Sequence, residues 1–169
     1  MKKVKFIPLA LIIGLAACSG GSEKSSSTDT AATTASTDTT HHAIDSTQMV
    51  APLPDVPAGA KVFFKNLKDG ETVKSPLKVE FGVEGIALDT AGAIKPASGH
   101  HHLLIDAGDS IAAGTVVPKD STHLHFGKAQ KETEIKLTPG EHKLTLQFAD
   151  GIHRSYGAKL AATIKVKVK

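Results

Sequence analysis

The chain contains no tryptophan, one tyrosine and one cysteine, and aromatic residues make up only 4% of it. So few aromatic rings argue against a carbohydrate or nucleobase site built on stacking. A single cysteine excludes an internal disulfide and any metal site held by a cysteine pair. The sequence also lacks a G-x-S-x-G motif and a glycine-rich phosphate loop. These absences favour a non-enzymatic domain.

Long hydrophobic runs are missing as well. The apolar segment 6–17 is shorter than the ~20 residues needed to span a bilayer. It follows a lysine-rich start and ends in Leu-Ala-Ala directly before Cys18, a pattern typical of a cleaved signal peptide. The junction resembles the lipobox of bacterial lipoproteins, in which the cysteine is acylated and becomes the new N-terminus. We therefore predict a signal peptide over 1–17 and lipidation of Cys18.

Charge gives little indication of a partner once the signal is removed. Three of the 20 basic residues lie in 1–17, so the mature chain has as many basic as acidic residues. This balance gives no reason to expect nucleic acid binding. The expected macromolecular contact is the membrane, through the lipid on Cys18. Ser19 in place of aspartate favours the outer membrane, on its periplasmic side or at the cell surface.

Composition divides the mature chain into two parts. Residues 19–40 are almost entirely small or polar and bury too little apolar surface to fold. Residues 49–57 contain three prolines and are expected to be extended. We predict that 18–57 is a lipidated, disordered tether and that 58–169 is the folded domain.

The folded part is expected to be all-β. Apolar and polar residues alternate in 76–84, 133–137, 142–148 and 160–169, which is the period of a half-buried strand. Turn sequences such as Asp69-Gly70 and Asp150-Gly151 separate the strands. Further strands are expected at 60–66, 101–107, 112–117 and 122–126. The sum is an antiparallel, immunoglobulin-like β-sandwich of seven to eight strands.

Histidine is the conspicuous residue of this domain. Seven of the nine histidines fall in 58–169, and five of these lie in the segments 99–106 (GHHHLLID) and 122–127 (THLHFG). In the first segment the strand period predicts that His101 faces inward with Leu103, and that its neighbours on either side face outward. In the second, Leu124 and Phe126 are expected inward and the two histidines outward.

If the two histidine segments pair as neighbouring strands, their outward rings can converge on one ion. Neutral imidazole suits copper or zinc. The predicted ligands are His100, His102, His123 and His125, with His153 as an additional ligand from a loop. Asp106 is a candidate partner for a ligand N–H. Such a domain would sequester, deliver or sense the metal.

Two other interpretations remain open. The histidines could form a structural cluster in an envelope interaction or scaffold domain. Alternatively, the domain could be a metal-dependent enzyme, in which His153 or Asp120 would be the general base. Outside the two segments, His142 is predicted at the rim of the core, and Arg154 and Tyr156 are expected to fix the loop that carries His153.

The words GHHHLLID (99–106), HLHFG (123–127) and PGEHKLTLQFADGIHRSYG (139–157) resemble a bacterial family known as domain of unknown function 4399. The segment FFKNLKDGETVKSPLKVEFGVEG (63–85) fits the same family. The resemblance covers about 58–169 and implies an exported, often lipid-anchored, histidine-rich domain. It implies no reaction. Ala129 stands where the resemblance leads us to expect glycine.

Overall fold

The structure, a computed structural model, describes residues 51–169. The predicted signal peptide, Cys18 and the tether up to residue 50 lie outside the described residues. Within 51–169, no helix has the length and apolar character required to cross a membrane. Residues 51–57 run along the folded domain, where Leu53 and Val56 pack against its core. Contacts with the domain therefore begin before residue 58.

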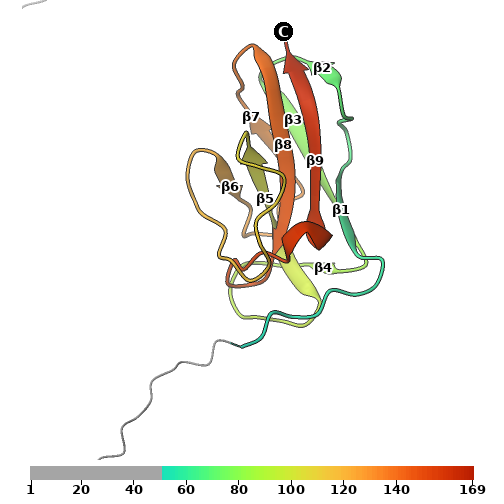
Figure 1. Cartoon of the computed structure of the whole chain (residues 1–169), viewed down its shortest axis with the longest axis vertical. Coiled ribbons are helices and arrows are strands. Elements are labelled where there is room, and N and C mark those ends of the chain that lie inside the picture. Colours follow the sequence, from blue (N-terminus) through green and yellow to red (C-terminus); the bar gives the residue numbers. More distant parts are fainter. Residues whose placement is uncertain (1–50) are drawn as a thin grey trace, which may run out of the picture. The chain divides into compact units, whose positions relative to one another are not determined.

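The described residues form nine strands and one short 3-10 helix (Figure 1). They are β1 (Lys61–Phe64), β2 (Glu71–Val73), β3 (Leu77–Glu84), β4 (Ala87–Leu88), β5 (Ser98–Ile105), β6 (His123–His125), β7 (Glu132–Ile135), β8 (Gly140–Ala149), η1 (Gly157–Leu160) and β9 (Ala161–Val168).

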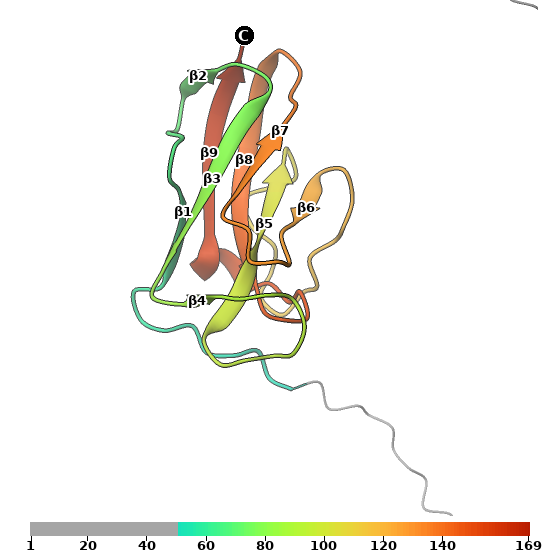
Figure 2. The ribbon, with the colours of Figure 1, turned by 180° about the vertical axis from the view of Figure 1, so that it is seen from behind.

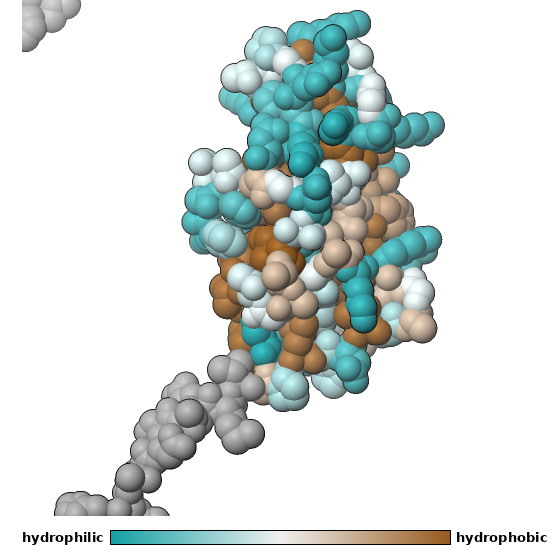
Figure 3. Space-filling view, in the orientation of Figure 1, coloured by the Kyte–Doolittle hydropathy of each residue, from teal (hydrophilic) through white to brown (hydrophobic). Residues whose placement is uncertain are grey.

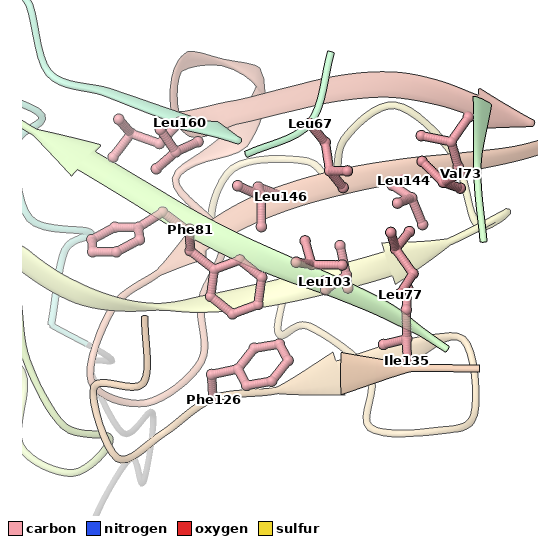
Figure 4. Close-up of a cluster of buried hydrophobic side chains, with 14 of the residues drawn as sticks. Leu67, Val73, Leu77, Phe81, Leu103, Phe126, Ile135, Leu144, Leu146 and Leu160 are labelled. Atoms are coloured by element: carbon pink, nitrogen blue, oxygen red, sulfur yellow. The ribbon is translucent and has the colours of Figure 1, made fainter. Parts of the chain in front are cut away.

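The strands form two sheets that face each other. One sheet has the order β1-β3-β7, and the other has the order β2-β9-β8-β5-β4, with β6 also paired to β5. Figure 2 shows β1, β3 and β7 in front of the larger sheet. The core fills the space between them, and Figure 4 shows Phe81 of β3 with Leu103 and Leu146 of the larger sheet. Each strand presents alternate side chains to this core.

The predicted all-β sandwich is confirmed, with corrections in detail. Most strand pairs are antiparallel, as predicted, but β2 pairs parallel with β9 and β4 pairs parallel with β5. Both strands are too short for their period to be read from the sequence. The strand predicted at 112–117 is a loop, which Gly114 bends at a φ of +80°. Ala129, where glycine was expected, has a φ of +56°, in the left-handed region that favours glycine.

Strand β5 is buried on both faces. Its inner residues face the core, and its outer residues lie under the β5–β6 loop (106–122) and the segment that follows β8 (150–160). Gln147 on the outer face of β8 accepts a hydrogen bond from the Ile111 N–H at 2.9 Å and donates to the Gly157 carbonyl at 3.0 Å. The domain thus has a third, irregular layer over one end of the larger sheet.

In the space-filling view, hydrophilic residues gather around the C-terminal end of the domain (Figure 3).

Candidate metal centre

The register of β5 and β6 brings the two histidine segments together. The strands pair antiparallel, with His102 opposite His125 and Leu104 opposite His123. On its other edge β5 pairs with β8, which places His100 opposite Ala149 at the end of that strand. The segment that leaves β8 then carries His153 back over the same face. The predicted neighbourhood of the two segments is therefore present.

Four imidazole rings converge at this point, and we call them the four-histidine cluster: His100, His102, His125 and His153. All six distances between their ring centroids lie between 4.7 and 5.9 Å. The Nε2 atoms of His100 and His102 are 3.1 Å apart, and those of His125 and His153 are also 3.1 Å apart. The rings thus meet through their Nε2 edges.

The cluster is buried, which corrects the expectation of a surface patch. His100 and His102 are 0% and 1% exposed, while His125 and His153 are partly buried. The alternation along a strand predicts which face of the sheet a side chain lies on, but not whether that face is exposed. Here loops cover the outer face. The loop residues 114–117 bond to the backbone of 153–155, including the Val117 N–H to the His153 carbonyl at 2.9 Å. The covering layer and the ligand loop therefore support each other.

Burial keeps the rings neutral. Loss of solvation, together with the nearby His125 and His153 rings, lowers the pKa of His100 to about 4. Loss of solvation, reinforced by the neighbouring histidines, lowers the pKa of His102 to about 2. The pKa of His125 is lowered for the same reasons. At neutral pH these rings therefore have a nitrogen lone pair to offer a ligand.

The backbone at His153 is strained in order to hold its ring in place. Its φ of +72° lies in the left-handed region, which costs a non-glycine residue about 1–2 kcal/mol. The buried Asp150 fixes this turn: it forms an ion pair with Arg154 at 2.7 Å and accepts the N–H groups of Ile152 and Arg154. Arg154 also donates to the Ala51 and Pro52 carbonyls. Arg154 fixes the loop, as its position in the sequence predicts.

Tyr156 anchors the other end of the same loop. Its buried hydroxyl donates to the Ser98 carbonyl at 2.6 Å, at the start of β5. The loop is thus tied to the strand that carries His100 and His102. This contact agrees with the anchoring role predicted for Tyr156.

Gly127 is a contact of the cluster that the sequence analysis did not identify. A Cβ atom at this position would lie 2.4 Å from both Cε1 and Nε2 of His125. The glycine therefore leaves room for the ring, two residues after the ligand itself. The signal in the sequence was the glycine of HLHFG, directly after the second histidine segment; in the structure it lies in a turn without a positive φ.

Two predicted participants, His123 and Asp106, lie outside the cluster. His123 is on the same face of β6 as His125, but its Nδ1 contacts Asp120 at 2.9 and 3.1 Å. His123 is not part of the four-histidine cluster. Asp106 contacts Nδ1 of His142 at 2.8 Å, rather than a cluster ring. His142 lies at the rim of the core as predicted, with its Nε2 2.9 Å from the Thr138 carbonyl oxygen.

His101 faces the core, as its phase in β5 predicts. It is fully buried, and its ring lies 5.3 Å from that of Phe81 and 5.1 Å from that of Phe148. Neither of its ring nitrogens has a hydrogen-bond partner. The pKa of His101 is lowered to about 4, chiefly by burial. It therefore behaves as an apolar side chain of the core.

The arrangement can hold a metal ion. Ligand atoms of His100, His102 and His125 lie within 4.8 Å of one another. His153 lies outside this group of three, although its Nε2 is 3.1 Å from that of His125. All of these side chains are imidazoles, which in the neutral form suit zinc and copper. The Nδ1 atoms of His100 and His102 have no hydrogen-bond partner. The chemistry of the donor set therefore fits a transition metal.

Comparison with known proteins identifies one family to which the chain is related. No curated protein and no solved structure shows a significant match to the chain. A family profile matches residues 79–169, from β3 to the end of β9, and this span holds every residue of the four-histidine cluster. The match covers more than half of the chain, and the chain belongs to the family described as Domain of unknown function (DUF4399).

Proposed function

We propose that this domain binds one transition-metal ion, copper or zinc, through the Nε2 atoms of the four-histidine cluster. The observation that carries the proposal is the convergence of two Nε2 pairs, each separated by 3.1 Å, at a buried point. Zinc–nitrogen bonds of about 2.0–2.1 Å in a tetrahedron place neighbouring nitrogens about 3.3 Å apart. Small shifts of the rings would accommodate an ion.

The contacts within the cluster support metal binding. Without an ion, one Nε2 of each pair donates its N–H and the other accepts, which makes two separate hydrogen bonds. A bound ion would instead use all four Nε2 lone pairs, with the proton of each neutral ring on Nδ1. It would thereby join the two pairs at one point.

The role we propose is sequestration, delivery or sensing of that ion in the cell envelope. The sequence at 1–18 supports export and a lipid anchor on Cys18, on a tether that holds the domain away from the membrane. Mass spectrometry of the N-terminal peptide from native membranes tests the anchor. An acylated Cys18 is expected, and a C18A variant should leave the membrane fraction. A free thiol at residue 18 would overturn the anchor.

The test of metal binding uses the full chain without an affinity tag. Elemental analysis and titration with Cu²⁺ and Zn²⁺ should give about one ion per chain. The variant in which His100, His102, His125 and His153 are all replaced by glutamine should bind none. The H142Q variant is the matched control, because both ring nitrogens of His142 already have partners. X-ray absorption should show only nitrogen neighbours at about 2.0 Å.

Two results would overturn the proposal. One is a wild-type chain that takes up neither ion. The other is a folded quadruple variant that binds as tightly as the parent, with circular dichroism as the check of folding. In the second case the histidine cluster would be structural, and chelator-insensitive capture of an envelope protein would support the scaffold interpretation. Metal-dependent turnover by the loaded protein would instead support an enzyme.

A further inference from the structure

A second histidine unit lies beside the four-histidine cluster. Asp120 accepts hydrogen bonds from the Thr122 and His123 N–H groups at 2.8 and 2.9 Å and from the Thr122 hydroxyl at 2.8 Å. The same carboxylate contacts Nδ1 of His123 at 2.9 Å. In the neutral ring this contact places the proton on Nδ1 and the lone pair on Nε2. Metal-binding histidines are typically oriented by a carboxylate in this way.

The domain contains a second histidine–aspartate pair that serves as a comparison. In the pair of His142 and Asp106, Nδ1 contacts the carboxylate at 2.8 Å, but Nε2 also contacts the Thr138 carbonyl oxygen at 2.9 Å. Both nitrogens of His142 are thus engaged as donors. His123 differs because Asp120 engages Nδ1 alone. The side chain of Asp120 is about half exposed and that of His123 is 15% exposed, so the pair reaches the surface chiefly through Asp120.

The position of His123 relates it to the cluster. His123 and His125 lie two residues apart on one face of β6, about 6.5–7 Å apart along the strand. Of the cluster residues, His100 and His102 are fully buried, while His125 and His153 keep some exposure. An ion from solution therefore reaches the cluster on the side of His125 and His153. His123 lies along β6 from that side.

We propose that His123, oriented by Asp120, is a capture ligand that binds the incoming ion first and passes it to His125. The inference rests on the proposed function, because it describes how the ion reaches the four-histidine cluster. A capture ligand replaces one water molecule bound to the hydrated ion. The buried rings then replace the remaining water ligands. The capture ligand speeds uptake and release together and leaves the equilibrium affinity unchanged.

The test measures uptake of Cu²⁺ and Zn²⁺ by stopped-flow, with equilibrium affinity measured by competition with a chelator. It compares the full wild-type chain with the H123A, D120N and H142A variants. In H123A the association rate and the dissociation rate should both fall, by the same factor. D120N should give a smaller loss of rate. H142A, the matched histidine–aspartate control, should keep the wild-type rate, and all affinities should stay equal.

Each other outcome is decisive. An unchanged rate in H123A would overturn the capture role and leave the proposed function intact. Loss of equilibrium binding in H123A would also overturn it, since His123 would then be a permanent ligand. If the wild-type chain binds neither ion, the proposed function itself fails. Should H123A not fold, H123Q retains a side chain of similar length without an imidazole and serves in its place.

Discussion

The two faces of strand β5 place adjacent histidines in opposite environments. His101 faces the sandwich core between Phe81 and Phe148, with no partner for either ring nitrogen. His100 and His102 face the covering loops and meet two other imidazoles. All three residues are fully buried, so burial alone does not distinguish them. What distinguishes them is whether the rings meet other ligand atoms.

The largest effect is expected from exchanging histidine for an apolar residue on each face in turn. H102L should reduce metal uptake to the background level, because it removes one of the two fully buried ligands. H101L should bind metal like the wild type. Isothermal titration with Cu²⁺ and Zn²⁺ measures both variants. Equal losses in the two variants would show that the strand as a whole, rather than its outer face, supports binding.

The next effect concerns the space around His125. In G127A the new methyl group would meet the His125 ring at 2.4 Å and displace it. Affinity for the ion should fall about 10- to 100-fold, the range seen when ligand orientation is disturbed. Thermal unfolding should confirm that the variant is folded, since no positive φ is required at Gly127. Wild-type affinity in folded G127A would mean that His125 is not a ligand.

The H101L variant should also change stability. Replacing a buried ring whose nitrogens lack partners with a hydrocarbon of similar size removes a desolvation penalty. The free energy of unfolding should rise by about 1 kcal/mol in denaturant titrations at pH 7. H101N, which keeps a polar group in the core, is the control and should be destabilised. A destabilised H101L would indicate a hydrogen-bonding role for His101.

The pH dependence of stability should follow the buried histidines. Their folded pKa values, about 4 for His100 and His101 and about 2 for His102, lie below the ordinary value of 6.5. The unfolded chain therefore binds more protons, and the metal-free domain should lose stability as pH falls below 6.5. H101L should lose stability less steeply between pH 6.5 and 4.

The same lowered pKa values should let metal binding persist below pH 6.5. A site made of imidazoles with the ordinary pKa would lose its metal at a higher pH.

The smallest effect concerns His142, whose pKa shifts in the opposite direction. The hydrogen bond to Asp106 raises the pKa of His142. The folded state therefore holds this proton more tightly, and the pair stabilises the domain below pH 6.5. That contribution is lost as pH rises through the raised pKa. Denaturant titrations from pH 5.5 to 8.5 should show it in the wild type and not in H142Q.

The sequence predicts most of the sheet and half of the site. Alternation in β3, β8 and β9 is strong, because each strand has one face in the core. In β5 the phase of Leu103 assigns the faces of His101 and His102 correctly. The short strands β2 and β4 have no detectable period. The parallel pairing of β2 with β9 joins segments far apart in the sequence, and that of β4 with β5 depends on the path of the loop between them.

The remaining half of the site depends on distances that a strand period does not contain. The period places His123 and His125 on one face, but it does not show that the ring of His123 contacts Asp120 and is not one of the four rings that converge. Burial of His100 comes from loops, and loop paths follow turn geometry and tertiary contacts rather than alternation. The contact of Gly127 with His125 likewise appears only when both are placed in space.

The four rings come from β5, β6 and the turn after β8, so residues 100 and 153 become neighbours only when the last strands have paired. An unfolded chain has no comparable set of ligands. A bound ion would then stabilise the folded state. It would add RT ln(1 + [L]/Kd) to the free energy of unfolding, where [L] is the concentration of free ion, or about 2.7 kcal/mol at a hundredfold excess over Kd. In an envelope poor in free metal the same domain would open more readily, so its lifetime would follow the metal supply.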